Sequence, residues 1–172
     1  MTPGGHPGQG GGLLAAIAAS VRTTVATRRA RVPMDALACA AGRSRPDGRR
    51  FRDAIGRPGR ANIIAECKRR SPARGVLARV YTPADLARSY EGHGAAAISV
   101  LTEPTFFDGA VAHLEAVRSA TPLPVLRKDF IVDDYQIYEA CAAGADAILL
   151  IVALLDPVSL RQLAGRAAAL GL

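Results

Sequence analysis

Two hydrophobic patterns divide the chain, one with a helical period and one made of continuous apolar runs. Between residue 13 and about residue 30, apolar side chains recur every three or four positions, which predicts an amphipathic helix. Five of them form one stripe: Leu13, Leu14, Ile17, Val21 and Val25. Pro33 ends this helix, and a short second helix is expected through Cys39. Beyond Arg60, uninterrupted apolar stretches alternate with helical ones, which is typical of strands buried on both faces.

After Arg60 the chain repeats one unit, a strand followed by a helix. Strands are predicted at residues 61–67, 95–101, 125–128 and 145–152. The helices that follow them are predicted at residues 83–91 with Thr82 as N-cap, at 110–119, from Asp133 or Asp134 to about 143, and from Pro157 onwards. Successive strand–helix units favour a parallel sheet, either in a doubly wound fold or in a (β/α)₈ barrel.

The residues at the strand ends help to choose between these two folds. No G-x-G-x-x-G motif follows the first strand, which argues against a dinucleotide-binding fold. Active sites of barrel enzymes are built from the carboxyl ends of the strands. Polar residues stand at three of these ends: Glu66 and Lys68, Thr102 and Glu103, and Lys128 and Asp129. We therefore predict an α/β fold of the TIM-barrel family at residues 61–172.

The residues before this segment differ in composition and charge. Residues 1–12 are mostly Gly and Pro and are predicted to form a disordered tail. Residues 13–60 are predicted to form a helical extension that ends in a mobile Arg/Gly/Pro-rich connection, anchored by Phe51 and Ile55. Residues 1–60 hold 11 Arg against three Asp, whereas residues 61–172 hold 11 basic and 12 acidic residues. Aromatic side chains do not alternate with these arginines, so the pattern argues against nucleic-acid binding.

Composition narrows the class of protein further. Hydrophobic residues make up 49% of the chain and charged residues 22%, which is typical of a globular protein. The three cysteines stand far apart and form no C-x-x-C, so neither a disulfide framework nor a metal site is expected. Met1 is not followed by a basic region and an apolar core, and no apolar run reaches the roughly 18 residues of a membrane span. We expect a cytoplasmic protein with no membrane partner.

Two lysines at the ends of different strands are the candidates for chemistry. Lys68 stands two positions after Glu66, and Lys128 stands next to Asp129. A lysine kept charged in a cleft can bind a phosphate or act as a general acid. The alternative is a pair of salt bridges at the rim, each worth about 0–1 kcal/mol, and spacing alone does not decide. His93 and His113 have no partner at the spacing of a triad or a metal site.

Four motifs occur in order at the strand ends: I-I-A-E-C-K-R-R-S-P, S-V-L-T-E-P-T-F-F-D-G, P-V-L-R-K-D-F-I-V-D-D-Y-Q-I and G-A-D-A-I-L-L-I-V. Together they resemble the indole-3-glycerol phosphate synthase family over residues 61–172. The helical segment from Leu13 resembles the N-terminal extension of that family.

This resemblance implies a lyase of tryptophan biosynthesis that needs no cofactor. Its phosphorylated substrate, 1-(2-carboxyphenylamino)-1-deoxyribulose 5-phosphate, loses carbon dioxide and water as the indole ring closes. Lys128 matches the general acid, Lys68 matches a lysine that contacts the substrate and assists dehydration, and Glu66 matches the carboxylate that orients both. Three substrate-binding positions are matched by Ser71, Phe107 and Leu149.

The resemblance extends over about half of a barrel, because a whole barrel takes about 250 residues. The general-base glutamate of the next strand and the glycine-rich phosphate loops have no counterpart, so turnover by this chain alone stays open. The unpaired edges of a half-barrel are expected to favour association. Two alternatives remain: another phosphate-binding barrel such as phosphoribosylanthranilate isomerase, and a non-catalytic fragment that binds a polyanion.

Overall fold

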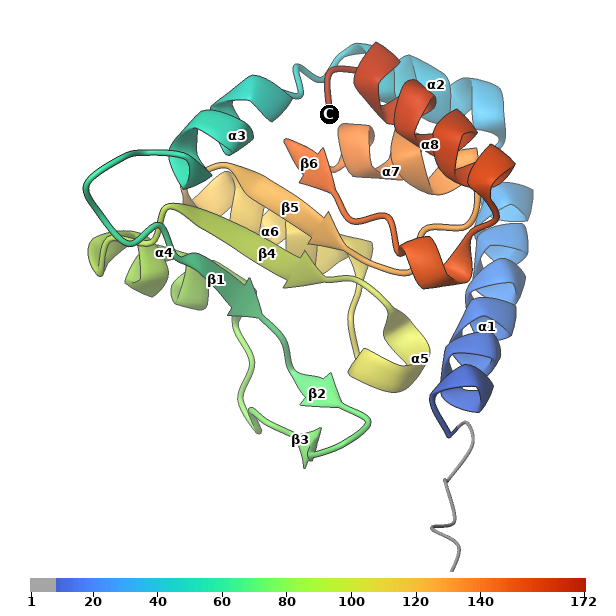
Figure 1. The fold of residues 1–172 in the computed structure, drawn as a ribbon, viewed down its shortest axis with the longest axis horizontal. Coiled ribbons are helices and arrows are strands. Elements are labelled where there is room, and N and C mark those ends of the chain that lie inside the picture. Colours follow the sequence, from blue (N-terminus) through green and yellow to red (C-terminus); the bar gives the residue numbers. More distant parts are fainter. Residues whose placement is uncertain (1–8) are drawn as a thin grey trace, which may run out of the picture.

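A four-stranded parallel sheet forms the centre of the computed structural model, which describes residues 9–172 (Figure 1). The strands follow one another in space in the same order as in the sequence: β1 (Ile64–Cys67), β4 (Ala97–Leu101), β5 (Val125–Lys128) and β6 (Ala147–Ile148). Because each crossover is a helix, the sheet is the beginning of a (β/α) barrel, and the predicted fold class is confirmed.

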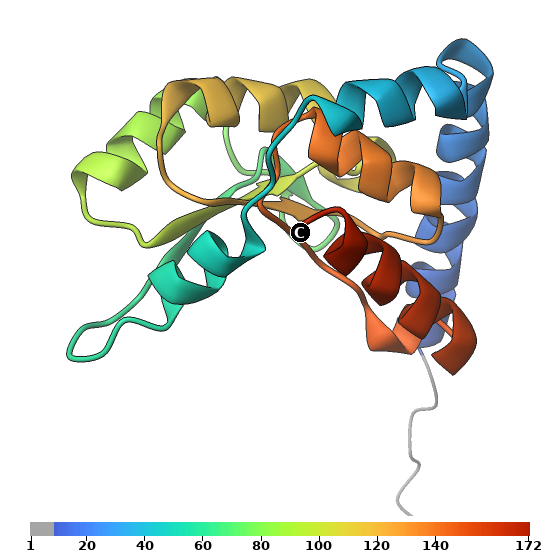
Figure 2. The same cartoon turned by 90° about the horizontal axis from the view of Figure 1, so that it is seen from above.

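Helices cover one face of this sheet. Figure 2 shows α4 (Pro83–Gly92), α6 (Val111–Ala120) and α7 (Asp134–Ala142) along that face, and α8 (Pro157–Ala169) packs against α7. The core between the sheet and the helices is made of fully buried aliphatic side chains, among them Ile98, Val100, Leu114, Val117 and Val125. This face holds the fold together.

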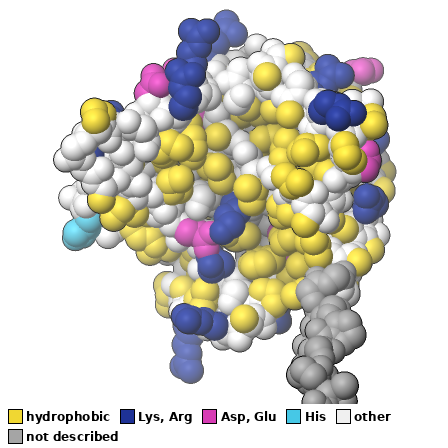
Figure 3. Space-filling model, in the orientation of Figure 1, with side chains coloured by type: hydrophobic (Ala, Val, Ile, Leu, Met, Phe, Trp, Pro, Cys, Tyr) yellow, Lys and Arg dark blue, Asp and Glu magenta, His cyan; other side chains and the backbone are white. Residues whose placement is uncertain are grey.

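The opposite face of the sheet is open. Side chains on a strand alternate between the two faces, so Ile64 and Glu66 of β1 point away from the helices. Ile64 is 42% exposed, although it lies within an apolar stretch of the sequence. Figure 3 views this face and shows hydrophobic groups around a small cluster of acidic and basic groups. The open face therefore corresponds to the interior of a complete barrel, and its edge at the carboxyl ends of the strands is where barrel enzymes carry their chemistry.

Two N-terminal helices pack on α7, and the first of them also contacts α5 (Pro104–Phe107) and the short 3-10 helix η1 (Val152–Leu154). In α1 (Gln9–Arg31), Ile17, Val21 and Val25 of the predicted stripe are buried, whereas Leu13 is exposed. The second helix, α2 (Met34–Gly42), lies against α7 as well. Burial of this stripe fixes the extension on the barrel segment.

Two helical segments lie where the sequence predicts a tail and a mobile connection. Residues 1–8 lie outside the described residues, and residues 9–12 belong to α1, because adding a turn to an existing helix needs no new nucleus. The predicted connection contains a helix, α3 (Gly48–Ile55), whose N-cap Asp47 accepts the amide of Arg50 at 2.9 Å. Phe51 of α3 is buried, as predicted, whereas the other predicted anchor, Ile55, is only partly buried.

The remaining elements match the sequence prediction more closely, with one short strand. Asp133 and Asp156 cap α7 and α8 through their side chains, whereas Thr82 stands at the N-cap of α4 without a side-chain hydrogen bond. The strand predicted at 145–152 is regular only at β6. It pairs with β5 alone. Two further backbone bonds extend the ladder, from the amide of Asp146 to the carbonyl of Val125 at 2.8 Å and from the amide of Leu149 to the carbonyl of Arg127 at 3.3 Å.

A group of buried charges fastens β5 to α7 and α1. The fully buried guanidinium of Arg127 donates to Asp129 at 2.8 Å and to Glu139 at 3.1 Å. From α1, Arg28 donates to the same Glu139 carboxylate at 3.0 Å. Burial would lower the pKa of Arg127, but the two facing carboxylates outweigh it and raise the pKa. We call Arg28, Arg127, Asp129 and Glu139 the buried charge cluster.

Replacing Arg127 by methionine is expected to lower the free energy of unfolding by about 3–5 kcal/mol, because the carboxylates of Asp129 and Glu139 would stay buried without this cation. Urea unfolding followed by circular dichroism measures the change. Arg88→Met is the control, since Arg88 pairs with Asp85 on an exposed helix surface; its cost is expected at about 0–1 kcal/mol. Equal effects of the two substitutions would contradict the role given to the buried charge cluster.

Candidate functional site

One carboxylate joins both candidate lysines on the open face. The ammonium group of Lys68 donates to one oxygen of Glu66, and that of Lys128 donates to the other oxygen. Glu66 and Lys128 belong to β1 and β5, which are separated by β4. We call Glu66, Lys68 and Lys128 the lysine cluster.

The strand register explains why these residues meet. Glu66 lies opposite Ser99 of β4, and Lys128 lies opposite Leu101, two residues further along the same strand. Because residues two apart on a strand share a face, all four side chains belong to the open face. The lysine cluster therefore follows from the parallel pairing of three strands and not from residues adjacent in sequence.

The lysine cluster is partly shielded from water. The side chains of Glu66, Lys68 and Lys128 are 23%, 29% and 39% exposed. Burial would raise the pKa of Glu66, but the hydrogen bonds and charges of Lys128 and Lys68 outweigh it and lower the pKa. With one anion between two cations, the cluster carries an excess positive charge that suits an anionic ligand.

An aromatic pair lies at the same end of the sheet. Phe107 belongs to the short helix α5 (Pro104–Phe107), which directly follows β4. Its ring packs against Phe130, which follows β5, with 5.9 Å between the ring centres. Phe107 is among the site residues predicted from the sequence and Phe130 is not, although the position of Phe130 two residues after Lys128 is a usable signal. Both rings are half-buried and offer an apolar wall.

Glu103 has a structural role that the strand-end pattern did not reveal. Its buried carboxylate accepts the backbone amides of Thr105, Phe106 and Phe107, and so it caps α5. Thr102 is also buried and donates to Asp129 at 2.6 Å, within reach of the buried charge cluster. Thr102, Glu103 and Asp129 therefore stabilise the strand ends by hydrogen bonds and do not face the lysine cluster.

Lys128 consequently has a different neighbour from the one that its sequence position suggests. Asp129, the adjacent carboxylate, points to the helix side and pairs with Arg127. Lys128 pairs with Glu66 instead. The alternation of side chains along β5 separates Lys128 from Asp129, and the same alternation brings it to Glu66.

Leu149 and Ser71 lie near the same edge but form no contact in the hydrogen-bond network of the lysine cluster. Leu149 follows β6 and shares the open face with Ala147, which lies opposite Leu126. Ser71 belongs to a small hairpin made of β2 (Arg70–Ser71) and β3 (Gly75–Val76), and its hydroxyl accepts the amide of Arg74 at 3.2 Å. Its role at the site stays a prediction.

The hairpin is tied to α5 by charge. Arg69 donates to Asp108 at 3.2 Å, and Arg70 lies 3.9 Å from the same carboxylate. Asp108 ends α5 with a left-handed backbone conformation at φ 52°. A pair of ion contacts thus holds the segment that carries Ser71 beside the segment that carries Phe107.

Other reactive groups do not form a second catalytic site in the described residues. Burial, with a further contribution from the charge of Glu66, raises the pKa of Cys67 to about 12, so its thiol is not a nucleophile at neutral pH. His113 packs edge-on against Tyr81, with 5.1 Å between the rings. In residues 9–172, no group of three potential ligands could hold a metal ion, and no helix is long and apolar enough to cross a membrane.

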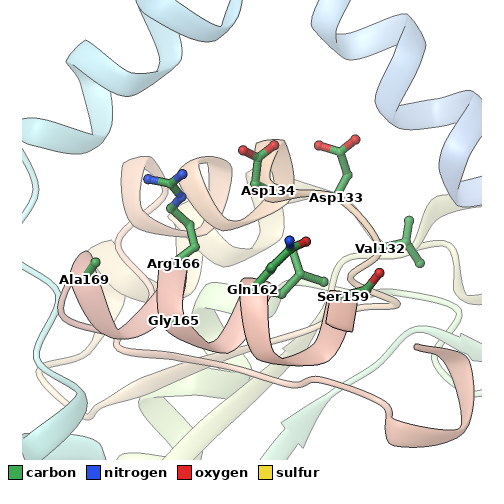
Figure 4. A pocket seen from close by; sticks show the side chains of 9 residues that line it. Val132, Asp133, Asp134, Ser159, Gln162, Gly165, Arg166 and Ala169 are labelled. Atoms are coloured by element: carbon green, nitrogen blue, oxygen red, sulfur yellow. The ribbon is translucent and has the colours of Figure 1, made fainter. Parts of the chain in front are cut away.

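A separate cavity of about 590 Å³ lies between the start of α7 and α8 (Figure 4). Asp133 and Asp134 on one side of it face Gln162 and Arg166 on the other. Asp133 already caps α7 and accepts a bond from Arg29 at 2.6 Å. Because Arg29 pairs with both carboxylates and Arg166 also lines the cavity, its charges balance and it lacks the excess positive charge of the lysine cluster.

Comparison with known proteins agrees with the geometry. The family described as indole-3-glycerol phosphate synthase matches residues 14–172. Proteins named indole-3-glycerol phosphate synthase from Burkholderia ambifaria (strain MC40-6) and Burkholderia vietnamiensis (strain G4 / LMG 22486) are each 49% identical to the chain over 166 residues. The protein of that name from Burkholderia multivorans is 49% identical over 164 residues.

These alignments cover 93% of this chain but 62% of each relative, so the chain spans less than two thirds of the length of the proteins it matches. The family match reaches from the N-terminal helices through all four strands. The chain therefore belongs to the indole-3-glycerol phosphate synthase family.

Proposed function

We propose that this chain provides the lysine-bearing half of an indole-3-glycerol phosphate synthase active site. In this reaction the indole ring of 1-(2-carboxyphenylamino)-1-deoxyribulose 5-phosphate closes, and carbon dioxide and water leave. The observation that carries the proposal is the single Glu66 carboxylate that holds Lys68 and Lys128 together on the open face. The family match supports the same activity.

The charges of the site suit this substrate. It carries a phosphate at one end and an aromatic carboxylate at the other, and the lysine cluster offers two ammonium groups. The aromatic ring of the substrate would lie against the half-buried rings of Phe107 and Phe130, with Leu149 on the same face. Cations beside an apolar wall are the combination that an aromatic anion requires.

Each lysine has a separate task in the proposed mechanism. Ring closure places negative charge on the carbonyl oxygen of the substrate, and Lys128 donates a proton to that oxygen as the new carbon–carbon bond forms. Loss of carbon dioxide restores the aromatic ring. Lys68 then protonates the departing hydroxyl group, which leaves as water. The neighbouring ring carbon loses a proton as the carbon–carbon double bond of the indole forms, and the base that accepts this proton would come from the part of the synthase that this chain does not cover. Glu66 keeps both ammonium groups aimed at the same space.

A direct test is to measure formation of indole-3-glycerol phosphate by the chain alone and by the chain mixed with the part of the Burkholderia ambifaria relative that it does not cover. This arrangement is chosen because the chain spans 62% of that relative. We expect product in the mixture. No product, with both parts folded and associated, would contradict the proposal.

Lys128→Ala is expected to lower turnover in that mixture by about a hundred- to ten-thousand-fold, the usual contribution of a general acid. Lys128→Arg is the matched variant, because arginine keeps the ion pair with Glu66 but does not release a proton at neutral pH. We expect Lys128→Arg to retain substrate binding and to lose turnover. Rate measurements at saturating substrate separate the two effects, and full turnover by either variant would refute the role of Lys128.

Glu66→Gln is expected to destabilise the chain in a pH-dependent way. Since the lysines lower the pKa of Glu66 in the folded state, its contribution is present above the unfolded pKa, about 4.3, and is lost as pH falls through the folded value. The difference in unfolding free energy between wild type and variant should thus shrink between pH 6 and pH 3. Urea unfolding at several pH values measures it.

Glu115→Gln is the control for this experiment, because Glu115 is exposed and takes part in no ion pair among residues 9–172. Its effect should stay small at every pH. A Glu66→Gln effect that remains constant from pH 6 to pH 3 would show that Glu66 gains nothing from its two lysines.

A further inference from the structure

A groove lined by arginines lies at the end of the sheet away from the lysine cluster. Its volume is about 470 Å³, within the size range of small-molecule sites. Residues of α3 and of the segment after it form one side, and residues that precede β4 and β5 form the other. We call it the arginine groove and define it by four basic residues: Arg49, Arg50, Arg57 and Arg60.

The carboxylates in the arginine groove do not neutralise these guanidinium groups. Asp47 is occupied as the N-cap of α3, where it accepts the backbone amide of Arg50 at 2.9 Å. Asp53 pairs at 3.2 Å with Arg52, whose side chain lies outside the groove. The ion pairs of residues 9–172 include none of the four basic residues of the groove. The groove therefore has uncompensated positive charge.

A neighbouring arginine, which is paired with Asp146 at 3.0 Å, lies close to this charge. Arg118 of α6 and Arg50 line an adjoining cavity of about 360 Å³. Burial lowers the pKa of Arg118, its partner Asp146 opposes that shift, and the positive charge of Arg50 adds to it. Like charges thus face one another at α3, and an anion would relieve their repulsion. Figure 3 shows basic side chains projecting at the edge where α3 lies in Figure 1.

The arginine groove is separate from the lysine cluster. Ala96 lies directly before β4 and Pro124 directly before β5, so both mark the amino ends of the strands. The lysine cluster lies at the carboxyl ends of β1 and β5. The five-residue strand β4 spans about 16 Å between the two ends of the sheet. This distance is too long for one small ligand to fill both sites.

The second wall of the groove is apolar and suggests the kind of ligand. Ala95, Ala96, Pro122, Leu123 and Pro124 form it opposite the arginines. Planar guanidinium groups bind phosphate oxygens in pairs, which lysines do not. We infer that the arginine groove is a binding site for a phosphate monoester whose organic part is small and apolar.

The groove favours a small ligand over a nucleic acid. Segment 43–60 carries seven arginines, but its one aromatic side chain, Phe51, is 7% exposed and cannot stack on a base. Binding of RNA is therefore an outcome that would count against this inference.

Phenyl phosphate is a suitable probe, because it combines a dianionic phosphate with an apolar ring. Titration followed by backbone amide NMR should show saturable shifts at Ala95 and Ala96, and phenyl phosphate should bind at least threefold more tightly than inorganic phosphate. The double variant Arg49→Gln/Arg57→Gln should weaken binding at least tenfold. Both side chains are exposed, so the fold should be unaffected, and urea unfolding checks it.

Two matched variants make the result specific. Arg88→Gln/Arg161→Gln removes the same charge from exposed positions outside the groove and should leave binding unchanged. Lys68→Ala/Lys128→Ala should also leave it unchanged, so this test is independent of the proposed enzyme activity. The inference would be overturned by loss of binding in either control or by the absence of saturable binding. It would also be overturned if a 20-nucleotide RNA bound more tightly than phenyl phosphate and substitution of each of the four arginines weakened RNA binding equally.

Discussion

Neighbouring cations on β5 point to opposite faces of the sheet, and the structure depends on this alternation. Arg127 points toward the helices and meets Asp129 and Glu139, while Lys128 points to the open face and meets Glu66. The first cation is fully buried and the second is 39% exposed. Two consecutive residues of β5 therefore serve different purposes: Arg127 stabilises the fold, and Lys128 belongs to the candidate site.

Hydrogen bonds link the buried charge cluster to the candidate site. Besides its carboxylate partners, Arg127 donates to Thr102, the residue that precedes Glu103, the cap of α5. Asp129 accepts the amide of Phe130 at 2.8 Å and so orients the ring that packs on Phe107. Because the buried charge cluster holds the ends of β4 and β5, it also fixes the lysine cluster and its apolar wall relative to each other.

The sequence alone predicts those features of the fold that depend on the local pattern of apolar and polar residues. Continuous apolar runs located the four strands, and Glu66, Lys68 and Lys128 could be assigned to one edge because parallel strands end together. It was insufficient where packing decided. The pairing of Lys128 with Glu66 requires the register of three strands. The helix at α3 forms because Phe51 and Ala54 are buried, which its Arg-rich composition conceals.

Ring closure at the lysine cluster would leave its product, indole-3-glycerol phosphate, on the open face beside Lys68 and Lys128. The most direct measurement is a titration of the chain with this compound, followed by NMR of the lysine side chains and of the backbone amides. We expect the largest shifts at Lys68 and Lys128, accompanied by shifts at Phe107 and Leu149. Shifts confined to the α7–α8 cavity or to the arginine groove, with both lysines unchanged, would contradict the proposed role of the lysine cluster.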